Sequence, residues 1–414
     1  MKKSWIIVPI FLLLFAQGAL AEEGARPPIT ERFQALFEET GDLAIAYHLA
    51  RIHSLAGNEA ADDWLALLEQ RDWQMGIDEV DFISSDTPTE RTELISRLQA
   101  QLQLLPSNKN AHTTLLDPQL LPESIAYDAR TRALFAGSLL GPRIVTQTQP
   151  FESPQVEERE FLIPDSDITG SIYGIKHDVA NGWLWVIQNG DENLVGGSVL
   201  TVLDRDGHLV KHYQFSSVKA EELNDLCLSK DAVYVTDSRG HRIFRGPRGG
   251  DTLSLFYEND DLQYPNGIAC NDQDAFIYVA DYRGISRLSS TGPVIHRRLV
   301  APDGFSLGGI DGLYLWQRNL IGIQNALGAP KVVKVAFIDD GLDASDIQIV
   351  DAFRPDYRIP TTGFIEGECL YYIANSSLDA LGADGTLNDR ARPPTRAKII
   401  AQNLATPGAR CKLT

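Results

Sequence analysis

The sequence has little positive charge for its length. It holds 37 Lys and Arg residues against 56 Asp and Glu residues, which gives a formal net charge of −19. A chain of this charge has no electrostatic attraction to nucleic acid or to an anionic membrane surface. We therefore expect neither as a partner. The acidity is compatible with cation binding and equally with solubility alone.

Long hydrophobic runs are missing after the N-terminus. The most extended apolar run is Trp5–Phe15, which follows Met1-Lys-Lys-Ser and leads to Ala19-Leu-Ala21. It is shorter than the ~20 residues that a membrane-spanning helix needs. The order of basic, apolar and small residues is typical of a secretory signal peptide over residues 1–21. We predict an exported protein, periplasmic or secreted, with no membrane anchor.

Cysteine is also scarce, since the chain has only Cys227, Cys270, Cys369 and Cys411. In an oxidising compartment these residues allow three complete pairings, and ordinary buried thiols are the alternative. Cys227 and Cys270 lie at the fourth and fifth positions of two equivalent strands. Alternation then sends their side chains to opposite faces, which makes them poor partners. We favour Cys369 with Cys411, which ties the C-terminal tail to the last strands.

Residues 22–110 differ from the rest of the chain in the spacing of their apolar residues. Residues 41–57 carry apolar side chains at helical spacing, and a second helix is predicted from about Ala60 to Gln70. A last helix is predicted from about residue 90 to Leu104, after a capping sequence. The first two helices, with small Ala residues where they would touch, resemble a tetratricopeptide hairpin. We expect this segment to pack against the rest of the chain or to bind a protein partner.

The remainder of the chain is rich in a repeated pair of strands. Six short apolar strands begin, at intervals of 42 to 51 residues, with Glu123, Tyr173, Asn224, Asn266, Asp311 and Thr362. Each runs through a tight polar turn into a second strand. A repeat of about 40–50 residues with four strands is typical of a β-propeller blade. We predict a mainly β fold: a six-bladed β-propeller over residues 111–414, preceded by a small α-helical segment.

The first residues of these strands bring oxygen ligands to one place. Equivalent positions of successive blades converge on the propeller axis. Glu123 and Asp311 are carboxylates, and Asn224 and Asn266 supply amide oxygens. This donor set favours Ca²⁺ over Zn²⁺, and other divalent cations also fit. Asn and Asp also favour turns, but that alternative does not explain Glu123 at the same repeat position.

Two of the repeats are similar to a known family. The segments Pro265-Asn-Gly-Ile-Ala-Cys and Leu223-Asn-Asp-Leu-Cys resemble blades of the gluconolactonase and regucalcin family, to which paraoxonases are distantly related. The resemblance covers roughly residues 115–404. It implies that Glu123, Asn266 and Asp311 are metal ligands. Asn224 matches an asparagine that binds metal in some relatives and substrate in others.

The resemblance and the donor set together predict a calcium-dependent hydrolase of a lactone or related ester. In this hypothesis the ion polarises the carbonyl group and activates water, and Asp311 is the catalytic base. Tyr173, His177 and Asn224 are predicted to contact the substrate, although His177 is also compatible with a core histidine between blades. Glu222 stands where many lactonases carry an arginine, which argues against an acidic sugar lactone.

A second hypothesis is a non-catalytic exported propeller. In that case the ion has only a structural role, and the surface binds a partner protein or ligand. A propeller fold alone does not decide between the two hypotheses, because propellers host both scaffolds and enzymes.

Overall fold

The computed structural model describes residues 29–73, 82, 87–100, 112–151, 156–162, 168–190, 197–270, 275–302, 305–326, 330–338, 343–352, 354, 356–382, 385–388, 391–406 and 408–411. The predicted signal peptide over residues 1–21 lies outside these ranges. Within them, no helix has the length and apolar character needed to cross a membrane.

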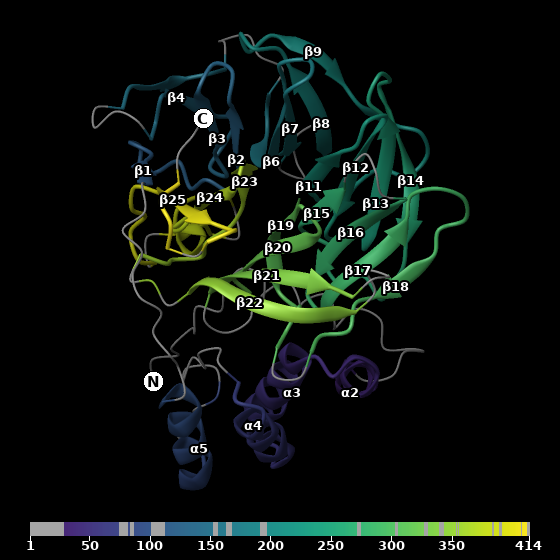
Figure 1. Cartoon of the computed structure of the whole chain (residues 1–414), viewed down its shortest axis with the longest axis vertical. Helices are drawn as coiled ribbons and strands as arrows, with labels where there is room; N and C mark the ends of the chain where they lie inside the picture. Colours follow the sequence, from purple (N-terminus) through teal and green to yellow (C-terminus); the bar gives the residue numbers. More distant parts are fainter. Residues whose placement is uncertain are drawn as a thin grey trace.

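Six sheets surround one axis as the blades of a β-propeller, as predicted, and their strands pair antiparallel except for one parallel pair at the outer edge of the five-stranded third blade (Figure 1). From the axis outwards, blade 1 consists of β2 (Ile125–Asp128), β3 (Ala133–Gly137), β4 (Ile144–Thr148) and β5 (Glu158–Glu160). Blade 2 consists of β6 (Ser171–Asp178), β7 (Trp183–Asn189), β8 (Ser198–Leu203) and β9 (Leu209–His212). Blade 3 consists of β11 (Leu223–Leu228), β12 (Ala232–Asp237), β13 (Arg242–Pro247), β14 (Thr252–Glu258) and β10 (Gln214–Phe215). Blades 4 to 6 consist of β15 (Ile268–Cys270), β16 (Phe276–Asp281), β17 (Gly284–Ser289) and β18 (His296–Arg298); β19 (Ile310–Trp316), β20 (Asn319–Gln324), β21 (Lys331–Phe337) and β22 (Ala344–Ala352); and β23 (Gly363–Glu366), β24 (Cys369–Ile373), β25 (Lys398–Asn403) and β1 (His112–Thr114).

The hydrophobic core is divided among the interfaces between neighbouring blades. Six separate apolar clusters lie between blades 1 and 2, 2 and 3, 3 and 4, 4 and 5, 5 and 6, and 6 and 1. Successive residues of β7 show the reason. Leu184 and Val186 pack toward blade 1, whereas Trp185 and Ile187 pack toward blade 3, because side chains of a strand alternate between its faces. Inner and middle strands are therefore apolar on both faces.

The ring is closed by a strand from the beginning of the described propeller. β1 pairs antiparallel with β25, with His112 opposite Ile400 and Thr114 opposite Lys398. β25 is the third strand of blade 6 and β1 is the fourth. The pairing joins both ends of the propeller sequence in one sheet.

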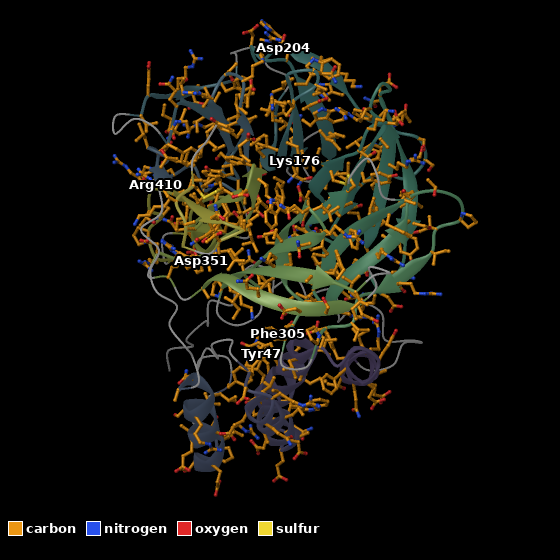
Figure 2. The ribbon with its side chains drawn as sticks, in the orientation of Figure 1. Tyr47, Lys176, Asp204, Phe305, Asp351 and Arg410 are labelled. Carbon is orange, nitrogen blue, oxygen red and sulfur yellow. A yellow bond between two sulfur atoms is a disulfide. The ribbon has the colours of Figure 1, made fainter. Side chains whose placement is uncertain are left out.

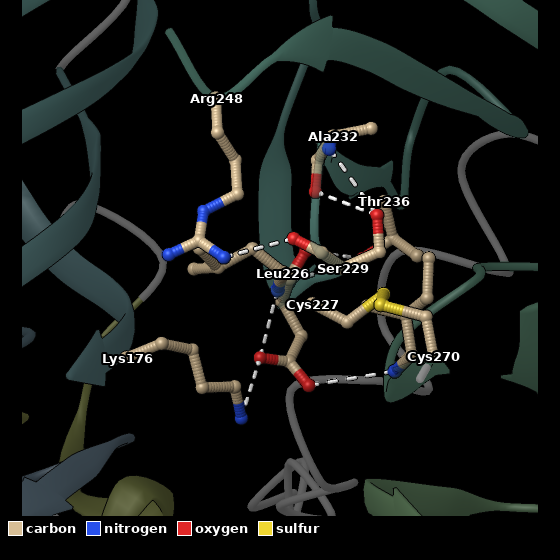
Figure 3. The surroundings of a disulfide bond; sticks show 10 residues. Lys176, Leu226, Cys227, Ser229, Ala232, Thr236, Arg248 and Cys270 are labelled. Carbon is tan, nitrogen blue, oxygen red and sulfur yellow. Dashed lines mark hydrogen bonds and ion pairs between the residues drawn. A yellow bond between two sulfur atoms is a disulfide. The ribbon is translucent and has the colours of Figure 1, made fainter. Parts of the chain in front are cut away.

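Two disulfides are present, Cys369–Cys411 as favoured and Cys227–Cys270 against expectation. The reasoning from alternation was wrong because these two cysteines belong to different blades. Blade 3 contacts blade 4 through one face of its sheet. Blade 4 contacts blade 3 through the opposite face of its own sheet. Opposite positions in the alternation therefore bring Cys227 and Cys270 together across the interface (Figure 3).

Four helices, α2 (Ile29–Thr40), α3 (Leu43–Leu55), α4 (Ala60–Gln70) and α5 (Thr89–Ala100), precede the described propeller and lie at one side of it (Figure 1). α2 lies outside the helices predicted from the sequence. The tetratricopeptide resemblance of α3 and α4 stays a prediction. Tyr282, in the β16–β17 turn, packs into the core of the helices, with its ring 4.3 Å from that of His48. Asp42 accepts a hydrogen bond from the Leu307 amide, so that the helices contact blades 4 and 5.

Candidate metal centre at the propeller axis

Three predicted ligands come from the beginnings of inner strands in different blades. Glu123 lies just before β2, Asn266 just before β15, and Asp311 is the second residue of β19. All three are buried. The side chain of Asn266 is close enough to the carboxylate of Asp311 to lower its pKa, and the charge of Asp311 acts on Glu123. The structure therefore brings these three residues together.

Steric crowding explains why a glycine, Gly267, follows Asn266. A Cβ atom on Gly267 would lie 2.3 Å from the carbonyl oxygen of Asp311 and 2.7 Å from the amide nitrogen of Leu313. Only glycine lets blade 4 approach blade 5 this closely. The close approach places Asn266 beside Asp311.

Irregular pairing occurs at the same end of three inner strands. The register shifts between Ile172 and Ile175 in β6, between Leu223 and Leu226 in β11, and between Ile310 and Gly312 in β19. Bulges redirect side chains and are frequent beside functional sites. These shifts bracket Tyr173, Asn224 and Asp311, the three site residues that lie within strands.

Burial dominates the electrostatics of the two axial carboxylates, Glu123 and Asp311. Burial raises the pKa of Asp311 to about 7, and the charge of Asp225 acts in the same direction. Burial also raises the pKa of Glu123 well above its ordinary value, and the charges of Asp311, Asp225 and Glu222 add to the effect. Two acidic groups are thus held in an environment that opposes their negative charge.

Three oxygen atoms of this group have no hydrogen-bond partner among the described residues. They are Oε2 of Glu123, Oδ1 of Asn266 and Oδ1 of Asp311, and each is buried. An unsatisfied buried polar atom is costly and requires an explanation. Carboxylate and amide oxygens are the donors that Ca²⁺ takes in proteins, so this set fits a divalent cation.

Other buried carboxylates of the propeller have partners. We call Asp178, Asp237, Asp281 and Asp351 the paired aspartates. Each contacts one arginine, with N–O distances of 2.6 Å to Arg248, 3.0 Å to Arg242, 2.9 Å to Arg298 and 2.9 Å to Arg354, respectively. Among the described residues, neither axial carboxylate, Glu123 nor Asp311, forms an ion pair with an arginine, and Asn325 donates to Asp311 instead. A bound cation would supply the missing positive charge.

Asn325 is a site residue that the sequence analysis missed. Its amide donates hydrogen bonds to Oδ2 of Asp311 and to the carbonyl oxygen of Pro360. The residue follows β20, and Ser138, Asn189 and Asn375 follow or end equivalent second strands. This second column of polar residues was the available signal. These residues lie at the ends of second strands, whereas the predicted ligands lie at the beginnings of first strands.

The predicted substrate residues fall into two places. Tyr173 is close enough to Glu123 and Glu222 for their charges, after burial, to raise the pKa of its hydroxyl. Asn224 is buried at the same end of β11, and its carbonyl oxygen lies against Gly174. His177 lies four residues beyond Tyr173, a distance of roughly 13 Å along a strand. Its Nε2 is 3.8 Å from Asp128, at the other end of the inner strands, so the structure does not bring His177 to this group.

A small cavity adjoins the group. Its volume is about 10 Å³, and its lining includes Asn266, Asp311, Asn325, Tyr282 and Ala326. This volume corresponds to roughly one water-sized sphere. Tyr282 and Ala326 also pack against the helices. The helical segment therefore supports one wall of the cavity.

A separate acidic cluster lies on the β8–β9 turn. Asp204, Asp206 and His208 each offer a ligand atom within 4.8 Å of the others. Asp204 already accepts the backbone N–H groups of Asp206 and His208, as in an ordinary polar turn. Figure 2 shows Asp204 on the outer edge of the molecule, whereas Lys176 lies toward the middle of the ring. This cluster has neither the burial nor the unpaired oxygens of the axial group.

Neither a protein-family model nor a curated protein matches the sequence. Among solved structures, the allergen Mala s 1 of Malassezia sympodialis is similar, with a TM-score of 0.51 and 15% identity over 72% of this chain and 96% of that chain. A gluconolactonase from Xanthomonas campestris has a TM-score of 0.46 and 17% identity over 71% of this chain and 87% of that chain. A virginiamycin B lyase from Staphylococcus aureus has a TM-score of 0.48 and 13% identity over 71% of this chain and 99% of that chain. At these identities the similarity shows the propeller fold alone.

Proposed function

We propose that the protein is a calcium-dependent hydrolase of a lactone or related ester. The observation that carries the proposal is the set of unpaired buried oxygens on Glu123, Asn266 and Asp311. These three residues would hold the ion, and Asn224, buried at the equivalent position of blade 3, would complete the donor set. A bound Ca²⁺ supplies Lewis-acid polarisation of the ester carbonyl group.

Asp311 is the residue that we expect to move the proton. Asn325 holds Oδ2 of its carboxylate, and Oδ1, which would contact the ion, has a second lone pair that can accept a hydrogen bond. Oδ1 would take a proton from the water that adds to the carbonyl carbon, and this proton would then pass to the departing alkoxide. A general base fixed in this way gains from its orientation.

Tyr173 and Asn224 are the residues that we expect to orient the substrate. Burial keeps the Tyr173 hydroxyl protonated at neutral pH, because it raises the pKa of the group. The hydroxyl can therefore donate a hydrogen bond to an ester oxygen. His177 has no part in this proposal because it lies at the other end of β6.

The charge around the site favours a neutral substrate. Glu222 is half-buried, and its carboxylate contacts Nε of Arg239 at 2.9 Å. The two charges compensate each other. An acidic substrate would therefore find no free guanidinium at the Glu222 position, where many lactonases carry an arginine.

One observation favours the second hypothesis, an exported propeller whose ion is structural. The cavity beside Asp311 has a volume of only about 10 Å³, which suits an ion or a water molecule better than an ester group. The helices also pack over blades 4 and 5. Under this alternative, the helical segment would bind a partner protein or ligand.

A hydrolysis screen separates the two functions. The purified protein is tested on neutral and acidic lactones and on aryl esters, with added Ca²⁺ and after removal of metal by a chelator. The hydrolase proposal expects turnover of a neutral substrate that disappears with the chelator and returns with Ca²⁺. Turnover that survives complete chelation contradicts it. Tight Ca²⁺ binding without turnover of any substrate supports the structural ion.

A further inference from the structure

One half-buried lysine pairs with an aspartate, Asp225, whose charge acts on the axial carboxylates. Lys176 extends from β6 of blade 2, and its Nζ atom is buried. The ammonium lies 3.2 Å from Oδ1 of Asp225 in blade 3 (Figure 3). It also lies 5.0 Å from the centre of the Tyr314 ring in blade 5. Because blades 2 and 5 lie opposite each other in a ring of six, Lys176 reaches across the axis.

The partners of Lys176 are fixed in place by other blades. Asp225 is 1% exposed, and its carboxylate accepts hydrogen bonds from the amides of Leu226 and Ile268. The Tyr314 hydroxyl accepts a hydrogen bond of 2.6 Å from the amide of Gly363 in blade 6. The pair of Lys176 and Asp225 is therefore a built feature of the axis and not a mobile surface contact.

The negative charge of Asp225 acts on both axial carboxylates. It contributes to the raised pKa of Glu123 and to that of Asp311. Without Lys176, the axis would carry the charges of three carboxylates. With the ammonium beside Asp225, the net charge is that of two carboxylates, which a divalent ion neutralises.

We propose that Lys176 determines the ionic charge accepted by the axial site and makes the site selective for divalent over trivalent cations. This inference rests on the metal site proposed above. Lys176 acts on the ion through its positive charge and does not ligate it. In a buried site the net charge of the surroundings weighs heavily, since the solvent screens it little.

A double-mutant cycle that removes the two charges singly and together tests this inference by isothermal titration calorimetry with Ca²⁺ and with La³⁺. Lys176→Met removes the positive charge and is expected to raise the ratio of La³⁺ affinity to Ca²⁺ affinity about tenfold, for charges roughly 10 Å apart at an effective dielectric constant of about 20. Asp225→Asn removes a negative charge and should lower the ratio by a similar factor. The double variant Lys176→Met/Asp225→Asn restores the net charge and should return the ratio to that of the parent.

The outcomes distinguish this inference from the metal site itself. If the parent protein binds neither ion, the metal site is wrong and the inference falls with it. If the parent binds Ca²⁺ but the ratio is unchanged in Lys176→Met, the site stands and the selectivity role is wrong. A ratio that stays altered in the double variant also overturns the inference, because it indicates damage to the structure and not a change of charge. Lys176→Arg, which keeps the charge, should retain the parental ratio.

Discussion

The paired aspartates and the axial carboxylates are both buried, but only the former have a guanidinium beside them. Asp281 illustrates the first group, because it accepts two hydrogen bonds from Arg298, at 3.0 Å and 2.9 Å. Asp311 illustrates the second, since its described partners are the uncharged amides of Asn325 and Asn266. We propose that the paired aspartates stabilise the blades, whereas the axial carboxylates bind a cation.

The largest difference between the two groups should be in activity. Asp311→Asn is expected to lower the rate of ester hydrolysis at saturating Ca²⁺ by about 100-fold or more, because the amide cannot accept the proton. The matched control is Asp351→Asn in a paired aspartate, which should leave the rate per folded molecule unchanged. Initial rates corrected for the folded fraction provide the measurement. An Asp311→Asn variant as active as the parent would remove the catalytic role of Asp311.

The next largest difference should be in stability. Asp281→Asn leaves Arg298, whose side chain is 7% exposed, without its carboxylate. Breaking a buried pair in this way is expected to lower the free energy of unfolding by about 3 kcal/mol. Urea unfolding of the parent and the variant in Ca²⁺-free buffer measures the loss. A loss below about 0.5 kcal/mol, which is typical of an exposed site, would contradict the structural role of the pair.

A smaller effect is expected from pH in the metal-free protein. The pKa of Asp311 is raised to about 7 in the folded state, above its unfolded value. Its contribution to stability is therefore complete at low pH and is lost as the pH rises through about 7. We expect the melting temperature in chelator to fall from about pH 4 to about pH 7 and to level off above, so that the last part of the fall lies between pH 6 and pH 8, and to fall less in Asp311→Asn.

Calcium should reverse this pH effect. Because the ion stabilises the ionised carboxylates, the increase in melting temperature on adding Ca²⁺ should be greater at pH 8 than at pH 6. The measurement is differential scanning calorimetry at both pH values. A metal-free melting temperature that rises over this window, or an equal Ca²⁺ effect at both values, would count against an unpaired axial group.

Much of the fold could be predicted because it repeats. Six similar strand pairs identified the blades, and the first residues of those strands included Glu123, Asn266 and Asp311. Features that depend on contacts between repeats were harder to predict. The Cys227–Cys270 disulfide required knowing which faces of two blades meet. The pairing of β1 with β25 required knowing how the ring closes.

The site was predicted only in part for a similar reason. Lys176 lies three residues after Tyr173, the first residue of the repeated strand pattern. Its partners Asp225 and Tyr314 come from two other blades. A residue that acts across the axis leaves no pattern within its own repeat. His177 shows the opposite error, because its chemistry suited a site from which the length of β6 separates it.

A calcium titration tests the central difference between the two groups most directly. Isothermal calorimetry is carried out on the parent, on Glu123→Gln/Asp311→Asn, and on Asp204→Asn/Asp206→Asn as the control for the surface cluster. We predict one Ca²⁺ bound per chain by the parent and by the control, and none by the axial variant. Absence of binding by the parent, or binding by the axial variant equal to that of the parent, would contradict a cation site at the propeller axis.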